Sequence, residues 1–197
     1  LKMASGSILY LELMKRVLTG LISVKPGDQE TFHNRYEGHD WPENADTMIG
    51  YRRLHNIQEC VTEIVRTNIP GDVIETGVWK GGATILMRAV LAAYGDTTRK
   101  VWVADSFEGL PPPDPKYPQD AGDKHYLQEP LAISIEDVKN NFIKYGLLDD
   151  QVQFLKGWFK DTLYDAPIEK LSLIRLDGDM YESTIQGFEA LYPKLSY

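Results

Sequence analysis

VIETGVWKGGAT, residues 73–84, contains the pattern that decides the fold. Its β-branched run, Val73–Thr76, predicts a short strand, and glycines follow in the turn over residues 77–82. The next segment, Ala83–Tyr94, has strong helical character and ends at Gly95. A strand, a glycine-bearing turn and a helix in this order are typical of the place where a nucleotide-like ligand meets a doubly wound sheet. We therefore expect a ligand-binding site at this turn.

Strand and helix patterns alternate along the rest of the chain. The predicted strands are Val73–Thr76, Val101–Asp105, Val152–Leu155 and Leu171–Leu176. The predicted helices are Ile8–Ile22, Asn56–Thr67, Ala83–Tyr94, one opened by Ser134 with Asp137 at the capping-box position, and Tyr181–Leu195. Short apolar strands separated by helices indicate a mostly parallel sheet that is covered on both faces. The predicted fold class is therefore α/β, with a doubly wound, Rossmann-like sheet.

The chain divides by pattern into two segments. Residues 1–55 are predicted to form an N-terminal helical cap, and residues 56–197 a Rossmann-like core. The apolar stripe over Leu9–Ile22 suits two roles equally, since it could cover the core or form a homodimer interface.

One stretch interrupts the alternation. GLPPPDPKYPQDAGDKHYLQEP, residues 109–130, holds six prolines and little periodicity. It is either a solvent-exposed loop or a lid over the carboxyl edge of the sheet, because long irregular insertions in compact domains are often functional. As a lid, it would be mobile without ligand and would become ordered when an acceptor binds.

Composition excludes several classes of protein. Apolar residues make up 43% of the chain, charged residues 25%, and the formal net charge is −8. That balance argues against a nucleic-acid groove, which needs a basic stripe. Cys60 is the single cysteine, so a disulfide framework and a cysteine-based zinc site are excluded. No apolar stretch approaches the length of a transmembrane helix, and a cytoplasmic location is the default expectation.

The acids beside the glycine turn indicate which ligand it would bind. The turn has the spacing G-x-x-x-G-G rather than GxGxxG, and Glu75 at the end of the strand would repel a pyrophosphate. S-adenosylmethionine carries an ammonium and a sulfonium, so an acid here would favour it. Asp105 ends the next strand, where an acid can accept both ribose hydroxyls. A tight structural turn without a ligand is the alternative.

Two aspartates follow the last predicted strand in LIRLDGDMYEST, residues 173–184. Side chains two residues apart along a strand project to the same face, so Asp177 and Asp179 could lean over one end of the sheet. Two like charges this close require a cation, a proton or a hydrogen-bond donor between them. Alternatively, Asp179 caps the helix that contains Glu182 and Thr184.

Five blocks of the sequence together resemble one enzyme family. They are DTMIGYRRLHNIQ, ETGVWKGGATILMRAVL, VWVADSFEGLP, FLKGWFKDTL and RLDGDMYEST, in that order. They are similar to the TylF-like sugar O-methyltransferases of the macrocin, mycinamicin and novobiocin pathways. The resemblance extends from about Ile8 to Leu195. It implies a methyltransferase fold, the cofactors S-adenosylmethionine and Mg²⁺, and a small-molecule glycoside, of macrolide or aminocoumarin type, as substrate.

The resemblance also implies roles for individual residues. Asp177 would be a Mg²⁺ ligand, and Asp179 the base that takes the proton of the acceptor hydroxyl. The cofactor would contact Met48, Glu75, Thr76, Gly77, Trp79, Gly81, Gly82, Asp105, Ser106, Phe107, Gly157 and Trp158. A divalent cation on the acceptor oxygen lowers its pKa and orients it, and a nearby carboxylate can then accept the proton.

Two other functions are compatible with the same residues. Paired acids and Mg²⁺ would also serve methylation of a phenolic, catechol-like acceptor. The second alternative function is that of a truncated protein that binds the cofactor without catalysis. In the family, a further strand ends in a pair of aspartates that completes the metal site, whereas this sequence stops at Tyr197. The chain is therefore expected to be truncated at its C-terminus and, as it stands, to bind Mg²⁺ poorly.

Overall fold

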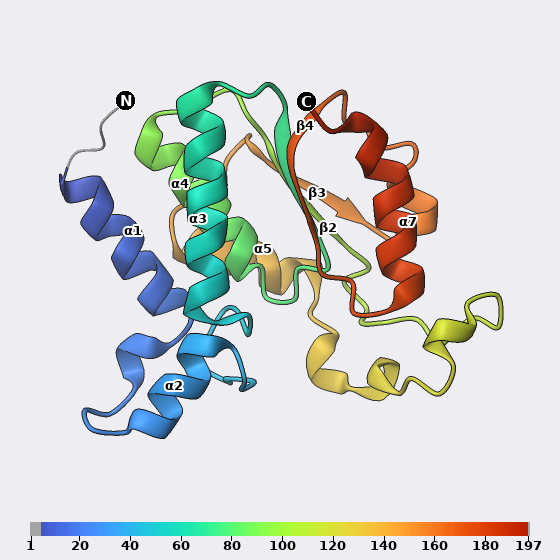
Figure 1. Cartoon of the computed structure of the whole chain (residues 1–197), viewed down its shortest axis with the longest axis horizontal. Helices are drawn as coiled ribbons and strands as arrows, with labels where there is room; N and C mark the ends of the chain where they lie inside the picture. The colour runs from blue at the N-terminus through green and yellow to red at the C-terminus, as the bar shows by residue number, and fades with distance from the viewer. Residues whose placement is uncertain (1–4, 197) are drawn as a thin grey trace.

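The computed structural model describes residues 5–196; residues 1–4 of the predicted N-terminal cap and Tyr197 lie outside this range. The described chain forms a four-stranded parallel sheet with helices on both faces (Figure 1). The strands are β1 (Asp72–Thr76), β2 (Val101–Asp105), β3 (Val152–Lys156) and β4 (Leu171–Leu176), in the spatial order β3-β2-β1-β4. The predicted α/β class and the parallel, doubly wound sheet are confirmed.

Two helical layers enclose the sheet. The helices are α1 (Ser5–Leu18), α2 (Gln29–Glu37), α3 (Gly50–Thr67), α4 (Gly82–Tyr94), α5 (Ile135–Lys144), α6 (Phe159–Thr162) and α7 (Tyr181–Leu191). The helices α1, α3, α4 and α5 cover one face, and α6 and α7 cover the other (Figure 1). Each face therefore has its own apolar core.

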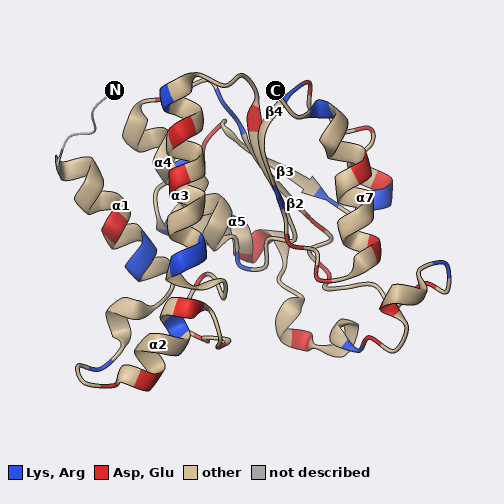
Figure 2. Cartoon of the chain, in the orientation of Figure 1, with Lys and Arg blue, Asp and Glu red and all other residues tan. Residues whose placement is uncertain are grey.

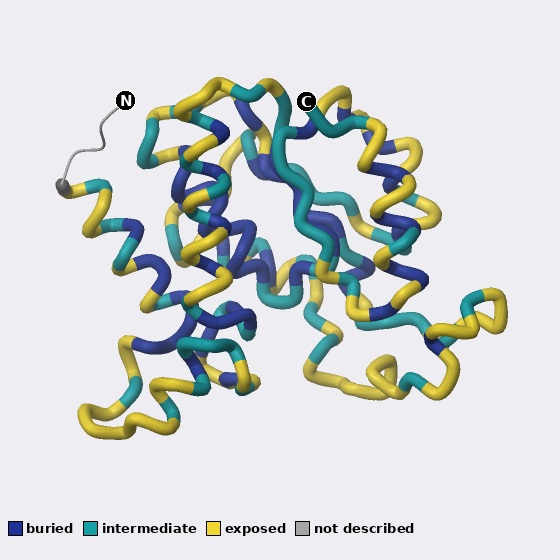
Figure 3. Tube along the Cα trace, in the orientation of Figure 1, coloured by how far each residue is buried: buried dark blue, intermediate teal, exposed yellow. Residues whose placement is uncertain are grey.

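The strands contribute to both cores by alternation. Val73 and Val103 lie in the core under α3 and α4, whereas Ile74 and Ala104 lie in the core under α6 and α7. Neighbouring side chains of a strand point to opposite faces, and the central strands β1 and β2 are buried along most of their length, whereas the edge strands β3 and β4 are mostly half-buried (Figure 3). This explains why the strands are near-continuous apolar runs in the sequence.

The predicted strands and helices are present, but the helices α2 and α6 were not predicted, and the start of α3 differs from its prediction. This helix begins at Gly50 rather than Asn56, because Leu54 is fully buried and extends the apolar stripe by one turn. The charged pair Arg52-Arg53 hides this turn from a reading of hydrophobic periodicity. Since α3 runs through residues 55 and 56, the predicted boundary falls inside a helix, and the division into cap and core stays a prediction.

The two faces of α1 differ. Leu11, Met14 and Leu18 pack into the core beside α4, so one face has the first of the two roles considered, covering the core. Leu9 and Leu13 are exposed on the other face, where the homodimer interface stays a prediction. Among residues 5–196, no helix has both the length and the apolar character needed to cross a membrane.

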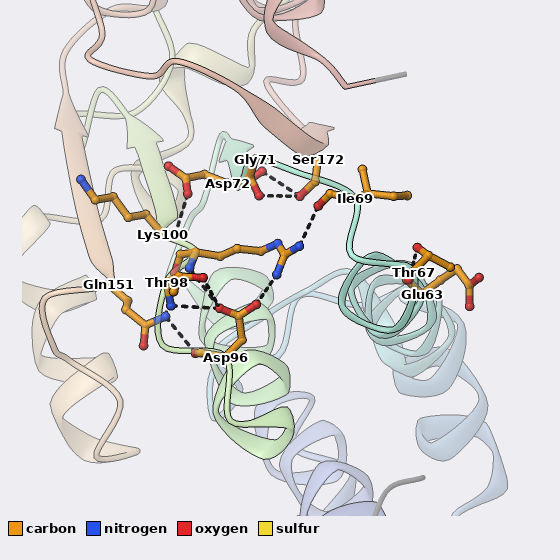
Figure 4. Close-up of polar contacts among 11 residues, drawn as sticks. Glu63, Thr67, Ile69, Gly71, Asp72, Asp96, Thr98, Lys100, Gln151 and Ser172 are labelled. Carbon is orange, nitrogen blue, oxygen red and sulfur yellow. Dashed lines mark hydrogen bonds and ion pairs between the residues drawn. The ribbon is translucent and has the colours of Figure 1, made fainter. Parts of the chain in front are cut away.

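Polar side chains close the edge of the sheet where the strands begin (Figure 4). Asp72 accepts the backbone N–H of Lys100 at 2.8 Å, and Arg99 donates to the carbonyl of Ile69 at 2.7 Å. The Gln151 side chain donates to the carbonyl of Arg99 at 2.7 Å. These bonds satisfy backbone polar groups in the loops at the amino ends of the strands. A ligand is therefore expected at the opposite edge, where the strands end.

Candidate active site

A cavity of about 360 Å³ lies at the carboxyl ends of the strands. Its walls include Glu75 from β1, Asp105 from β2, Gly157 after β3 and Asp177 after β4. Figure 2 shows acidic positions at these strand ends, above the loop over residues 109–130. β1 pairs with β2 on one side and with β4 on the other, so the strand order changes direction at β1. Ligands bind at this point in doubly wound sheets, and the cavity lies there.

Most of the residues predicted from the sequence meet in this cavity. It is lined by Met48, Glu75, Gly77, Trp79, Asp105, Ser106, Gly157, Trp158, Asp177 and Asp179. The structure places four predicted residues outside the lining: Thr76, Gly81, Gly82 and Phe107. The cavity also contains residues that were not predicted, among them Leu110, Pro111, Asp114, Lys160, Glu182 and Gln186.

The glycines of the turn bring segments of the chain close together. Gly77 has φ +82°, and a Cβ there would lie 2.2 Å from the carbonyl oxygen of Asp177. At Gly82, a Cβ would lie 2.4 Å from the carbonyl oxygen of Asp46, which accepts the Gly82 N–H at 2.9 Å. The close approach at Gly82 is therefore made to the protein backbone. The absence of a side chain at Gly77 lets the glycine turn lie directly against Asp177.

Asp105 organises the first turn through backbone bonds. One carboxylate oxygen accepts the N–H of Val78 at 2.8 Å, and the other accepts the N–H of Phe107 at 2.8 Å. Burial raises the pKa of Asp105, and these backbone donors oppose the rise. Trp79 and Phe107 both have positive φ, at 48° and 58°, so the bonds hold a strained turn. The Ser106 hydroxyl also donates to this carboxylate, at 3.3 Å, so a ligand hydroxyl would compete with donors of the turn for Asp105.

Arg175 joins two of the predicted acids. Its guanidinium donates to Glu75 at 2.6 Å and pairs with Asp177 at 2.7 Å. Burial raises the pKa of Glu75 to about 8, and the positive charge of Arg175 opposes that rise. The second oxygen of Glu75, Oε2, is buried without a hydrogen-bond partner among the described residues. The cavity wall therefore contains a buried acceptor that a ligand donor could satisfy.

Arg175 was not predicted as a site residue, although the sequence contains a signal for it. It is a charged residue inside the apolar strand LSLIRL, two positions before Asp177 and thus on the same face. A charge within a buried strand needs a partner. Its partner Glu75 becomes evident only from the register, because β1 and β4 pair Glu75 with Arg175.

Asp179 lies in a strained turn beside Asp177. Its φ is 58°, uncommon for a residue other than glycine, and its side chain lines the cavity. Partial desolvation raises its pKa, and the negative charge of Asp177 adds to the rise. A carboxylate with a raised pKa is a stronger base than an ordinary aspartate, which suits proton abstraction.

The structure does not support a capping role for Asp179. The N-cap residue of α7 is Met180, and its side chain makes no capping bond. The carboxylate of Asp120 accepts the first N–H groups of the helix instead. Asp179 therefore remains available to the cavity.

The described residues contain no cluster of three or more histidine, cysteine, aspartate or glutamate side chains suited to a metal ion. Within residues 5–196, Asp177 and Asp179 thus have no third histidine, cysteine, aspartate or glutamate placed to share a metal ion with them.

A family model described as Macrocin-O-methyltransferase (TylF) matches residues 24–197. Among curated proteins, demethyldecarbamoylnovobiocin O-methyltransferase of Streptomyces niveus is 50% identical, over 98% of this chain and 78% of the relative. The 8-demethyl-8-(2,3-dimethoxy-alpha-L-rhamnosyl)-tetracenomycin-C 4'-O-methyltransferase of Streptomyces olivaceus is 52% identical, over 95% and 76%. Mycinamicin III 3''-O-methyltransferase of Micromonospora griseorubida is 46% identical, over 98% and 81%.

Solved structures agree with the sequence matches. The structure of the O-methyltransferase NovP has a TM-score of 0.86 and 49% identity, covering 96% of this chain and 80% of NovP. The calicheamicin methyltransferase CalS11 has a TM-score of 0.58 and 19% identity, covering 93% and 73%, and shares the fold. The family match and the identities over nearly the whole chain confirm the predicted resemblance: the chain belongs to the TylF family of macrocin O-methyltransferases and is an O-methyltransferase.

Proposed function

We propose that the chain transfers the methyl group of S-adenosylmethionine to a sugar hydroxyl of a glycosylated natural product of macrolide or aminocoumarin type, with Mg²⁺. One observation carries the proposal: the buried Glu75, with an unpartnered oxygen, lines the same cavity as Asp105 and the acid pair. The names of the relatives support the acceptor class, because they are O-methyltransferases of novobiocin, rhamnosyl-tetracenomycin and mycinamicin compounds.

Glu75 and Asp105 are the proposed cofactor acids. The second oxygen of Glu75 would accept a bond from the cationic methionine part, and Asp105 would accept the ribose hydroxyls. Met48 and Trp158 line the same cavity and would exclude water from the apolar parts of the ligand. Each of these contacts orients the methyl donor before the acceptor arrives.

Asp179 is the proposed base. A sugar hydroxyl is a poor nucleophile at neutral pH, so it must lose its proton as it attacks the methyl carbon. Asp179 faces the cavity, and its raised pKa favours accepting that proton. Arg175 holds Asp177 by an ion pair, which keeps the two carboxylates in different environments and therefore suits them to different roles.

The acid pair fits Mg²⁺ in part. Asp177 and Asp179 are both exposed, and the charge of Asp177 helps to raise the pKa of Asp179, so a cation between them would relieve repulsion. Mg²⁺ usually keeps several waters and needs only one or two carboxylates, so Asp177 would serve as a ligand. A bound Mg²⁺ would lower the pKa of the acceptor hydroxyl.

Isothermal titration with S-adenosylmethionine, run with and without Mg²⁺, tests the cofactor assignment. In the full-length protein, we expect one binding site per chain, and we expect Mg²⁺ to change the titration. Absence of any binding heat at several temperatures would contradict the proposed cofactor. Binding that never depends on the metal would contradict only the Mg²⁺ part of the proposal.

The affinity for S-adenosylmethionine should depend on pH through Glu75. The pKa of Glu75 is raised to about 8, so a cationic ligand that prefers the carboxylate must displace a proton below that pH. We expect the affinity to increase by up to about tenfold per pH unit between pH 6 and 7.5 and to level off near pH 8. Titration calorimetry over this range measures the slope. The Glu75→Gln variant should bind more weakly and lack the slope, whereas a flat profile for the unmodified protein would contradict the role of Glu75.

Replacing Asp105 by alanine should weaken cofactor binding in two ways. The variant loses the proposed bonds to ribose, and it also releases the backbone N–H groups of Val78 and Phe107 that hold the turn. Bonds to a charged acceptor are worth about 1.5–3 kcal/mol, so we expect affinity for S-adenosylhomocysteine to fall about ten- to hundredfold. Asp161→Ala, which alters an exposed acid outside the cavity lining, is the control. Unchanged affinity in Asp105→Ala would show that the ribose assignment is wrong.

A further inference from the structure

Asp120 is the buried anchor of the long loop over residues 109–130. Only 6% of it is exposed, although most of the residues around it in the loop are open to solvent (Figure 3). Its two carboxylate oxygens accept the backbone N–H groups of Tyr181 at 2.7 Å and Glu182 at 2.9 Å. A residue 61 positions away in sequence thus caps α7.

The capped end of α7 adjoins the acid pair. Asp177 and Asp179 lie in the turn between β4 and α7, and the N–H of Met180 closes that turn on the carbonyl of Gly178 at 2.6 Å. Asp179 has a left-handed φ of 58°, so the turn is strained. A strained conformation persists only where its surroundings fix it. The Asp120 carboxylate fixes the residues directly after the turn.

The same loop lines the cavity and contacts the first glycine turn. Leu110, Pro111 and Asp114, near its start, belong to the cavity wall. Near its other end, the carbonyl of Pro130 accepts the indole N–H of Trp79 at 2.8 Å. The loop therefore bridges the glycine turn over residues 77–82 and the turn between β4 and α7 that contains Asp177 and Asp179.

We propose that Asp120 is a positioning residue, through which docking of the 109–130 loop on α7 sets the geometry of Asp179. This inference rests on the proposed role of Asp179 as base and adds a device that joins the loop to that base. When the loop is docked, the carboxylate of Asp120 fixes the N-terminus of α7. The turn over residues 177–180 then holds Asp179 toward the acceptor. When the loop leaves, the first N–H groups of α7 lose their partner and the turn loosens.

Two arguments favour a specific role for this carboxylate. A carboxylate at a helix N-terminus is stabilised by the N–H groups and by the helix dipole, so docking has a defined partner. In addition, displacing a catalytic group by about 1 Å can lower the rate about 10²-fold, so a small loosening of the turn is enough to affect the reaction.

The test compares Asp120→Ala and Asp120→Asn with the unmodified full-length protein. We expect Asp120→Ala to lower kcat by about ten- to hundredfold while the Kd of S-adenosylmethionine changes by less than about threefold. Asp120→Asn keeps one acceptor oxygen and should lie between the two. Hydrogen–deuterium exchange should become faster in both residues 111–130 and residues 177–184 of Asp120→Ala.

Asp28→Ala is the matched control, because Asp28 also caps a helix, accepting the N–H of Thr31 at 3.1 Å in α2. It should remove a comparable cap without changing kcat or exchange near α7. The proposal is overturned if Asp120→Ala keeps its kcat, or if exchange at 177–184 does not change. Should Asp120→Ala fail to fold, Asp120→Asn decides by the same two measurements. If the unmodified protein methylates no sugar, the proposed function fails, whereas the exchange comparison still tests the coupling.

Discussion

Asp179→Asn is expected to lower the rate of methyl transfer by about 10²–10⁴-fold while leaving the affinity for S-adenosylmethionine nearly unchanged. The amide has almost the shape of the carboxylate but cannot accept the proton of the acceptor hydroxyl. The surrounding structure should tolerate the change, because the Asp179 carboxylate accepts no hydrogen bond from another described residue. Single-turnover kinetics with a saturating acceptor would separate the chemical step from product release.

Asp177→Asn is the matched variant for this experiment. If Asp177 is a Mg²⁺ ligand, its replacement should raise the Mg²⁺ concentration needed for half-maximal rate, and part of the rate should return at high Mg²⁺. The loss in Asp179→Asn should not respond to Mg²⁺. Rescue of Asp179→Asn by the metal would mean that the two roles are exchanged.

Arg175→Met should strongly destabilise the fold, because Arg175 pairs with two acids of the cavity wall. The guanidinium lies between the buried Glu75 and Asp177, at 2.6 and 2.7 Å. Removing one partner of a buried ion pair costs about 3–5 kcal/mol when the other partner stays charged. Glu75 can escape part of that cost by binding a proton, since burial already raises its pKa to about 8.

The proton on Glu75 makes this loss of stability depend on pH. Without Arg175 the pKa of Glu75 in the folded protein rises further, while in the unfolded chain it stays near 4.5. Because the pKa of Glu75 is already about 8 in the parent, both proteins lose stability as pH rises above about 4.5, and only the variant continues to lose it above pH 8. Urea unfolding of both proteins at about pH 6, 8 and 9 measures the difference in stability, which should be largest at the highest pH.

Arg66→Met provides the control for Arg175→Met. Arg66 pairs with Glu63 at 3.4 Å, but both side chains are more than half exposed. Exposed pairs of this kind contribute about 0–1 kcal/mol, so the control should unfold almost as the parent does. Equal stability of Arg175→Met and the parent at pH 8 would show that Glu75 does not depend on this guanidinium.

Local patterns in the sequence were enough to predict the sheet and the edge that holds the cavity. The predicted ends of two strands, Asp105 and Leu176, are the observed ends of β2 and β4. Such ends can be predicted because the period and composition of a segment do not depend on the rest of the chain. Ser134 is also confirmed as the N-cap of α5, since its hydroxyl accepts the Asp137 N–H at 3.1 Å, although the Asp137 carboxylate accepts the Ser134 hydroxyl rather than the backbone N–H that a capping box requires. Parallel topology then placed the strand-end acids at one edge.

The interactions that connect distant segments could not be predicted in this way. Pairing of Arg175 with Glu75 depends on the register between β1 and β4, which no single segment determines. Capping of α7 by Asp120 depends on the path of a long loop without periodicity. The contact of Gly82 with the carbonyl of Asp46 is likewise a tertiary contact, which the pattern of the glycine turn does not reveal.

The position that receives the methyl group tests the central claim most directly. The full-length protein would be incubated with Mg²⁺, S-adenosylmethionine labelled in its methyl group, and an acceptor panel of glycosylated macrolides and aminocoumarins, their sugar-free aglycones and a simple catechol. Mass spectrometry would locate the label. We predict that the label appears on a sugar hydroxyl of at least one glycoside and on none of the aglycones. Label on the catechol or on an aglycone phenol, with the glycosides unlabelled at their sugars, would contradict the proposed function.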